Sequence, residues 1–289
     1  MKRILILCLA LLLVTSAYAF ADEIIINKLG GDHTDFAFAP DAQVLEVYFP
    51  KIFGVDAALV RYGEFTLLID CGGSQWKSTR ALLEKLNVTE LTYALNTHPD
   101  ADHIGGFNHV LKDIPAGEFL LGFPEDHERG HEVRFKVYEA LHEQGIPFRR
   151  VYNGDTIEFG DVSISVYQRT DADLPSVNDS SVMLMIQYGE RRILFTGDIE
   201  YAGQTVLCED PACPDLKADI LKFPHHGYAP MHDQFLSRIS PELVISTCGK
   251  TDTSGLKQLE DKKIPYYITA NRIIRLATDG KVWTLESVN

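Results

Sequence analysis

The order of strand-like and helix-like segments constrains this chain more than any other feature. Short runs of β-branched and aromatic residues follow one another closely, and several are joined by glycine-containing turns. The runs are Val44–Tyr48, Ala57–Arg61, Phe65–Ile69, Leu91–Leu95, Thr156–Phe159, Ser163–Tyr167, Val182–Tyr188, Ile193–Thr196, Asp219–Lys222 and Leu243–Ser246. Helical patterns cover Trp76–Leu86, Phe135–Gln144 and about Asp233–Ile239. Without a repeat or a Pro/Ser-rich linker between them, these segments predict a single α+β domain with two packed sheets covered by helices.

Composition limits the partners of the chain. Its 289 residues are 45% hydrophobic, which is enough for a sizeable core. The chain carries 41 acidic and 27 basic residues, giving a formal charge of −14. An acidic surface repels phosphate backbones and anionic lipids, so broad nucleic-acid binding is disfavoured. The overall charge is still compatible with a locally basic groove.

The first 19 residues have the three parts of a secretory signal peptide. Lys2 and Arg3 precede the apolar run Ile4–Val14, and the small-x-small triplet Ala17-Tyr18-Ala19 follows. This run is shorter than the roughly 20 residues that a membrane-spanning helix needs, and an uncleaved anchor is the alternative. Cleavage after Ala19 leaves residues 20–289 as the mature domain and takes the net charge to −16 by removing both basic residues. We therefore expect a periplasmic or secreted protein with no membrane span after cleavage.

An exported chain meets an oxidising compartment, which bears on its cysteines. Cys208 and Cys213 flank the turn-forming Asp210-Pro211, and we expect them to form a local disulfide. A soft metal site is the alternative, although neither a second cysteine pair nor a histidine lies nearby. Cys71 and Cys248 follow apolar runs, and the sequence leaves open whether they are buried thiols or a second bridge.

Histidine and aspartate gather directly after strand-like runs, where loops project from a sheet edge. The first group, His98-Pro99-Asp100-Ala101-Asp102-His103, places two imidazoles and two carboxylates within six positions. Asp198 ends the run Phe195-Thr196-Gly197, and the adjacent His225 and His226 follow Asp219–Lys222. Nitrogen and oxygen donors of this kind suit Zn²⁺ or Mn²⁺. A solvated acidic turn with a helix-capping aspartate is the alternative for the first group.

These motifs, together with Asn178-Asp179-Ser180-Ser181-Val182, resemble the ordered motifs of the metallo-β-lactamase-fold hydrolases. Within them, the chain is similar to the branch of the DNA-uptake competence protein hydrolase domain and the choline-phosphate esterases. Phe53-Gly54-Val55-Asp56-Ala57 and Leu67-Leu68-Ile69-Asp70-Cys71-Gly72-Gly73 resemble the opening strands of that branch. The likeness runs from about Val44 to Ser246 and implies a four-layer αββα sandwich, the metallo-β-lactamase fold.

The resemblance also implies a ligand set for two divalent metal ions, Zn²⁺ or Mn²⁺. The first ion would be bound by His98 and Asp100, with Asp179 as a third ligand. The second would be bound by Asp102, His103 and one of His225 or His226. Asp198 would bridge both ions. The residues expected to take part in catalysis are Asp102, Asp198 and His226.

Two departures from relatives bear on the substrate. Asp100 stands where true β-lactamases have a histidine, a replacement typical of the phosphoester-cleaving branch. A late Gly-His-Pro motif is absent, because the run from Gly249 to Leu256 contains no histidine. The role of that histidine must therefore be filled otherwise in this chain.

The function that the resemblance implies is an exported metal-dependent hydrolase, with a phosphodiesterase favoured. Two cations held about 3.5–4 Å apart would share a hydroxide that attacks phosphorus. We expect a small-molecule or cell-wall-linked phosphoester as substrate, since the negative charge of the chain disfavours nucleic acid. The alternatives are a carbonyl-ester hydrolase of the lactonase, thioesterase or β-lactamase type, and a binding protein with a degenerate site.

A few polar residues lie outside the main motifs. Asp70 follows a strand and is a candidate for orienting a ligating histidine. Asp56 also lies at a strand end, and the sequence assigns it no role. His127 and His131 are expected on a solvated loop, with substrate contact as the less favoured alternative.

Overall fold

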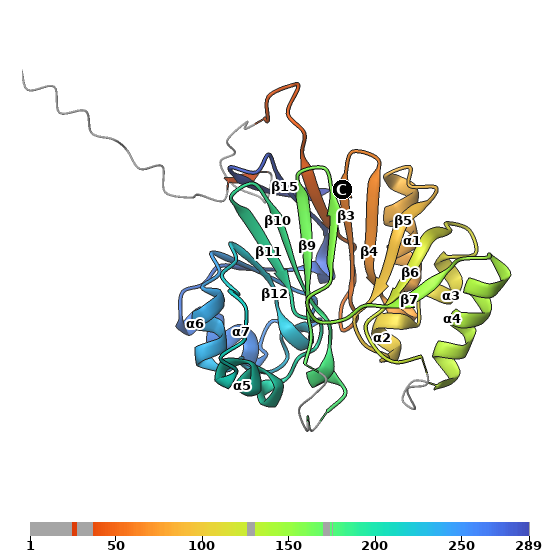
Figure 1. The fold of residues 1–289 in the computed structure, drawn as a ribbon. Helices are drawn as coiled ribbons and strands as arrows, with labels where there is room; N and C mark the ends of the chain where they lie inside the picture. Colours follow the sequence, from red (N-terminus) through yellow and green to blue (C-terminus); the bar gives the residue numbers. More distant parts are fainter. Residues whose placement is uncertain (1–24, 28–36, 126–130, 170–173, 175, 289) are drawn as a thin grey trace, which may run out of the picture.

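Two β-sheets lie face to face at the centre of the molecule, and helices cover their outer sides (Figure 1). The computed structural model describes residues 25–27, 37–125, 131–169, 174 and 176–288. This is the expected four-layer αββα sandwich in one domain.

The first sheet has the strand order β1-β16-β15-β2-β3-β4-β5-β6-β7. Its strands are β1 (Ile25–Asn27), β2 (Leu45–Phe49), β3 (Ala57–Tyr62), β4 (Phe65–Cys71), β5 (Leu91–Asn96), β6 (Ala116–Leu121), β7 (Phe148–Arg150), β15 (Ile273–Thr278) and β16 (Trp283–Val288). β2, β3 and β4 form the antiparallel meander that the turns predict, and β4, β5, β6 and β7 pair in parallel.

The second sheet has the order β14-β13-β12-β11-β10-β9-β8. Its strands are β8 (Thr156–Phe159), β9 (Val162–Tyr167), β10 (Met183–Tyr188), β11 (Arg191–Phe195), β12 (Ile220–Lys222), β13 (Leu243–Ser246) and β14 (Tyr266–Ile268). β8 to β11 are antiparallel neighbours, whereas β11 to β14 run parallel. The polar loops after β11, β12 and β13 therefore emerge at one edge.

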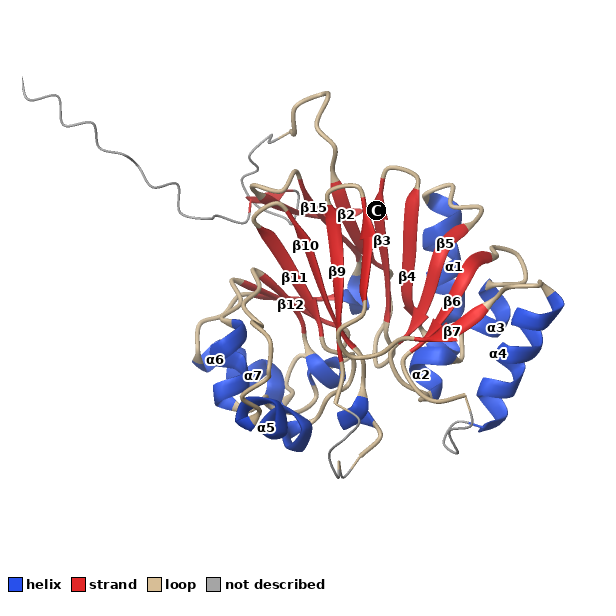
Figure 2. Cartoon of the chain, in the orientation of Figure 1, coloured by secondary structure: helices blue, strands red, loops and turns tan. Residues whose placement is uncertain are grey.

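Helices cover each sheet on its outer face (Figure 2). Beside the first sheet lie α1 (Trp76–Lys85), α2 (Ala101–Ile104), α3 (Phe107–Val110) and α4 (His131–Glu143). Beside the second lie α5 (Tyr201–Glu209), α6 (Asp233–Ile239) and α7 (Ser254–Asp261). Short 3₁₀ turns complete the chain at η1 (Gly73–Gln75), η2 (Asn178–Ser180), η3 (Pro224–Gly227) and η4 (Thr269–Asn271).

The alternation of apolar side chains explains the layers. Both faces of the central strands are apolar, so each sheet buries one face against the other sheet and one against helices. Leu45, Val60, Ile164 and Ile245 lie in the core between the sheets, whereas Leu59 packs under the helices of the first half. A third apolar cluster fills the space between the second sheet and α5, α6 and α7.

A charged cluster crosses three strands of the first sheet. Glu46 on β2 accepts hydrogen bonds from the Nε atoms of Arg61 and Arg275, each at 2.7 Å, and from the hydroxyl of Tyr48. Burial alone would raise the pKa of Glu46, but these donors outweigh it and hold that pKa below its usual value. The side chain is only 13% exposed, so solvent screens the cluster weakly.

Most predicted segments appear within one or two residues of their expected bounds, and Thr156–Phe159, Leu243–Ser246 and Asp233–Ile239 agree fully. The predicted disulfide is wrong for this structure, in which Cys208, Cys213, Cys71 and Cys248 are all free. Cys208 is buried on the last turn of α5, where the helix and its apolar packing hold it. Burial also raises the pKa of the Cys208 thiol.

The predicted signal peptide lies outside the described residues, as does His127. No helix within the described ranges combines the length and the apolar character needed to span a bilayer.

Candidate metal centre

Strand direction brings the polar motifs to a single edge of the sandwich. β4, β5, β11 and β12 all end at this edge, because they are parallel within their sheets. Asp70 lies at the end of β4, His98 follows β5, Asp198 follows β11 and His226 follows β12. Asp56 reaches the same edge because β3 is antiparallel to β4 and begins where β4 ends.

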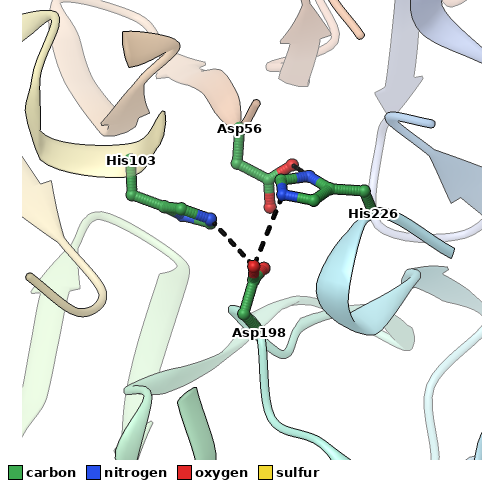
Figure 3. A group of neighbouring side chains, drawn as sticks. All are labelled: Asp56, His103, Asp198 and His226. Carbon is green, nitrogen blue, oxygen red and sulfur yellow. Dashed lines mark hydrogen bonds and ion pairs between the residues drawn. The ribbon is translucent and has the colours of Figure 1, made fainter. Parts of the chain in front are cut away.

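Four buried side chains form the centre of the site, and Figure 3 shows Asp198 lying between His103 and His226. Each of Asp56, His103, Asp198 and His226 offers one ligand atom, and these atoms lie within 4.8 Å of one another. Asp198 Oδ2 is 3.2 Å from His103 Nε2 and 3.4 Å from His226 Nε2. Three of these residues, His103, Asp198 and His226, are among the expected ligands, and Asp56 is not.

Asp70 fixes the orientation of His103, as the sequence suggested. Its Oδ2 lies 2.7 Å from His103 Nδ1, which turns Nε2 of the same ring toward Asp198. The carboxylate itself accepts hydrogen bonds from Asn96 Nδ2 and from the backbone and side chain of Thr97. Although burial opposes a charged ring, Asp198 and Asp70 raise the pKa of His103 well above its ordinary value.

Asp56 plays the same part for His226, a role that sequence reasoning missed. Asp56 Oδ1 is 3.0 Å from His226 Nδ1 and also accepts from the Thr247 hydroxyl. Asp56 Oδ2 forms an ion pair with the buried ammonium of Lys222. Burial lowers the pKa of His226, but Asp198 and Asp56 outweigh it and raise this pKa to about 9.

The turn that carries the histidine pair is strained. His225 and His226 have φ angles of 47° and 59°, so two consecutive non-glycine residues occupy the left-handed region. This backbone sends the two rings in different directions. His226 is 1% exposed and faces the cluster, whereas His225 lies at the rim with its side chain 36% exposed.

Several buried polar atoms in the site have no hydrogen-bond partner among the described residues. They are His98 Nε2, Asp198 Oδ1 and Asp179 Oδ2, whereas His103 Nε2 has only the ion-pair contact with Asp198 Oδ2 at 3.2 Å. Burial and the neighbouring His103 lower the pKa of His98 to about 4, so its ring is neutral at pH 7 and keeps a lone pair for a ligand. Unpaired imidazole nitrogens beside unpaired carboxylate oxygens are what a divalent cation would satisfy, and the residues fit such an ion.

The other predicted ligands surround this centre. His98 is buried with its ring centroid 4.1 Å from that of His103, and Asp102 Oδ2 is 3.1 Å from His226 Nε2. Asp100 is half-buried at the start of α2, where its backbone carbonyl accepts from His103 N and Ile104 N.

Asp179 and His225 are placed differently from the central group. Asp179 Oδ1 accepts hydrogen bonds from Glu200 N and Gly203 N at the start of α5. His225 Nε2 is 4.0 Å from Asp198 Oδ2, and its Nδ1 is 3.2 Å from Glu200 Oε1. The structure therefore puts His226 inside the cluster and His225 beside it.

The segment that lacks the late histidine stabilises the turn that carries His225 and His226, because its side-chain hydroxyls donate to backbone carbonyls of that turn. Thr253 caps α7 by accepting from Leu256 N, and its hydroxyl donates to Gly227 O at 2.6 Å. Ser254 Oγ donates to Tyr228 O. Hydroxyl groups in this segment thus tie down the turn that carries His225 and His226.

Comparison with known proteins agrees with this architecture. The family model of the metallo-beta-lactamase superfamily matches residues 51–238. ComE operon protein 3 of Bacillus subtilis is 28% identical over 211 residues, covering 64% of this chain and 26% of that protein. Recombination protein 2 of Haemophilus influenzae is 24% identical over 235 residues, covering 76% of this chain and 26% of its own length. The chain thus spans about a quarter of the length of these relatives.

Among solved structures, the metallo-beta-lactamase fold protein YhfI of Bacillus subtilis superposes with a TM-score of 0.52. It is 12% identical, and the match covers 80% of this chain and 99% of that structure, which supports the fold alone. The resemblance drawn from the motifs, including that to competence proteins, is confirmed. By its sequence match and its fold, the chain belongs to the metallo-beta-lactamase superfamily, and its buried cluster of histidines and aspartates is a candidate metal site.

Proposed function

We propose that the protein is an exported phosphodiesterase that uses two divalent cations, Zn²⁺ or Mn²⁺, on a small-molecule or cell-wall-linked phosphoester. The observation that carries this proposal is the buried set of unpaired imidazole nitrogens and carboxylate oxygens around Asp198. Its donors are rich in oxygen, which favours cations that also bind phosphoryl oxygens.

Each side chain has a role in the proposed site. His98 and Asp100 would hold one cation, Asp102, His103 and His226 the other, and Asp198 would contact both. When bound, such cations supply Lewis-acid activation of water and neutralise charge on the phosphoryl group. Asp179 is a less direct candidate, because one of its oxygens already caps α5.

The attacking oxygen is assigned to water because the neighbouring nucleophiles are engaged or inert. Ser181 Oγ accepts a hydrogen bond from Asp198 N, and burial raises the pKa of the Cys71 thiol well above its ordinary value. The water oxygen forms a bond to phosphorus as the bond to the leaving alkoxide breaks. The alkoxide keeps that electron pair and takes up the proton that water releases.

Two side chains near the reacting atoms can hold that proton. Asp102 is partly exposed, with its side chain 38% accessible, and it contacts His226 Nε2. His225 at the rim is placed to contact a substrate oxygen or the leaving group.

The test is hydrolysis of bis(p-nitrophenyl) phosphate and p-nitrophenyl acetate by the mature chain. Metal is first removed by chelation and then Zn²⁺ or Mn²⁺ is restored. We expect turnover of the phosphodiester only with restored metal. We also expect Asp102→Ala to abolish tight binding of one ion and nearly all of this activity.

Asp161→Ala is the matched control, because Asp161 is exposed in the β8–β9 turn, away from the site. It should keep the wild-type rate and bind two ions. Faster metal-dependent cleavage of the acetate than of the phosphodiester would overturn the phosphoester assignment. Two tightly bound ions without turnover of either ester would favour a binding protein.

A further inference from the structure

An apolar pocket of about 580 Å³ opens beside the metal centre, on the side of α5. Its base is made of Ile199, Phe223 and Met231, which are nearly or fully buried. Its mouth is formed by Ala229, Pro230 and Tyr201, and Tyr201 is 58% exposed. A concave apolar wall open to solvent is a common form of small-ligand site.

The pocket and the metal centre share the same turns of the chain. Ile199 directly follows Asp198, and Phe223 lies three residues before His226. His225 lines the pocket and stands between it and the cluster, with Nε2 4.0 Å from Asp198 Oδ2. A group bonded to a phosphorus atom at the centre would therefore reach the pocket by passing His225.

The charges of the pocket restrict what it takes. No lysine or arginine is among the described residues that line it. Its two acidic residues already have protein partners, since Glu200 Oε1 accepts from Asn178 Nδ2 at 3.0 Å and lies 3.2 Å from His225 Nδ1. Asp179 Oδ1 accepts the two N–H groups at the start of α5. A second phosphate or a carboxylate would be repelled by these two carboxylates, and the apolar base of Ile199, Phe223 and Met231 offers no acceptor for a cation.

We propose that this pocket binds an uncharged apolar substituent, such as an aryl or short alkyl ester group, of the substrate that reacts at the metal centre. The proposal rests on the proposed function for the identity of the reacting head group. It adds the substrate class, a mixed phosphodiester with one apolar arm.

The test is a series of p-nitrophenyl phosphodiesters with the same leaving group and a methyl, phenyl or 2-aminoethyl second ester group. For the metal-loaded wild-type chain we expect kcat/KM for the phenyl compound to exceed that for the methyl compound about tenfold. This ratio corresponds to removal of roughly 60 Å² of apolar surface from water. The 2-aminoethyl compound should gain no such advantage.

Two variants then change the volume of the pocket. Ala202→Trp on the first turn of α5 fills it, and should reduce the phenyl-to-methyl ratio to about one. Met231→Ala enlarges the base and should shift the preference toward a 1-naphthyl compound. Thr205→Trp, on the same helix but outside the pocket, is the control and should keep the wild-type ratio.

Binding of phenylphosphonate and methylphosphonate to the metal-loaded chain, measured by calorimetry, separates this proposal from the proposed function. Tighter binding of phenylphosphonate that Ala202→Trp removes would support the pocket even if no phosphodiester were turned over. Equal binding of the two phosphonates, or a phenyl preference that neither pocket variant changes, would overturn it. A preference for the 2-aminoethyl compound would also overturn it.

Discussion

Replacing the members of the buried Lys222–Asp56 pair tests how the second half of the site is held. Both side chains are at least 92% buried, and besides Asp56 the ammonium of Lys222 donates to Phe223 O at 2.9 Å. Asp56→Asn leaves this cation with neutral acceptors only, so we expect a loss of about 3–5 kcal/mol in the free energy of unfolding. Lys222→Met leaves Asp56 facing His226 and Thr247, and we expect a loss of about 2 kcal/mol.

The double variant carries neither buried charge and isolates the pair. Because no uncompensated ammonium remains, its loss should be about 2–3 kcal/mol smaller than the sum of the two single losses. The measurement is urea unfolding in the presence of a chelator, so that bound metal does not contribute to stability.

The metal affinity of the same variants is a second, independent test of the role of Asp56. Asp56→Asn removes the carboxylate that orients His226, and we expect metal binding to weaken by about 10–100-fold in the single and the double variant. Asp219→Asn is the matched control, because Asp219 forms an ion pair with the buried Arg191 away from the cluster. It should lose stability and keep the wild-type metal affinity. Additive single losses, or an unchanged affinity in Asp56→Asn, would refute the reasoning.

Three further predictions concern the scaffold. Glu46→Gln should lower the free energy of unfolding by about 1–2 kcal/mol at pH 7 and by less near about pH 3. Folding lowers the pKa of Glu46, so its carboxylate stabilises the folded chain at pH values above the unfolded pKa, and this contribution is lost as the pH falls. A pH-independent difference in urea unfolding would contradict this. Gly106→Ala should cost more than about 3 kcal/mol, since its Cβ would lie 2.0 Å from Cys71 O, whereas Gly63→Ala, with open space, should cost about 1 kcal/mol; equal melting temperatures would argue against the close contact. Thr253→Ala should cost about 1–2 kcal/mol through loss of the α7 cap and of the Gly227 contact, and Thr253→Ser should restore most of it in thermal unfolding.

The sequence predicted the motif-bearing parts of this fold well because those parts have strong local signals. Leu91–Leu95 is apolar and ends in a dense polar loop, and the structure places that loop at the sheet edge as β5 and α2. The C-terminal strands β15 and β16 were not predicted. β15 lies beside β2 through pairing across more than 200 residues, which no local pattern contains, and β16 joins the sheet by pairing with β15.

The supporting residues of the site were harder to predict than its candidate ligands. Asp70 was identified because it ends an apolar strand, whereas Asp56 stands before its strand and resembles an ordinary turn residue. Lys222 ends an otherwise apolar run, and its burial depends on Asp56 lying opposite it in the fold. The disulfide prediction failed because spacing and turn residues do not show that α5 continues through Cys208.

The strand topology divides the site between two halves of the chain. His103 and Asp56 belong to the first sheet and its loops, whereas Asp198, Lys222 and His226 belong to the second. Neither half alone contains a complete set of donors, so a cation bound here would be held by residues of both halves and would link them. Occupancy of the site would then report on whether the two halves have docked, and an incompletely assembled chain would have little affinity for the metal that the proposed hydrolysis requires.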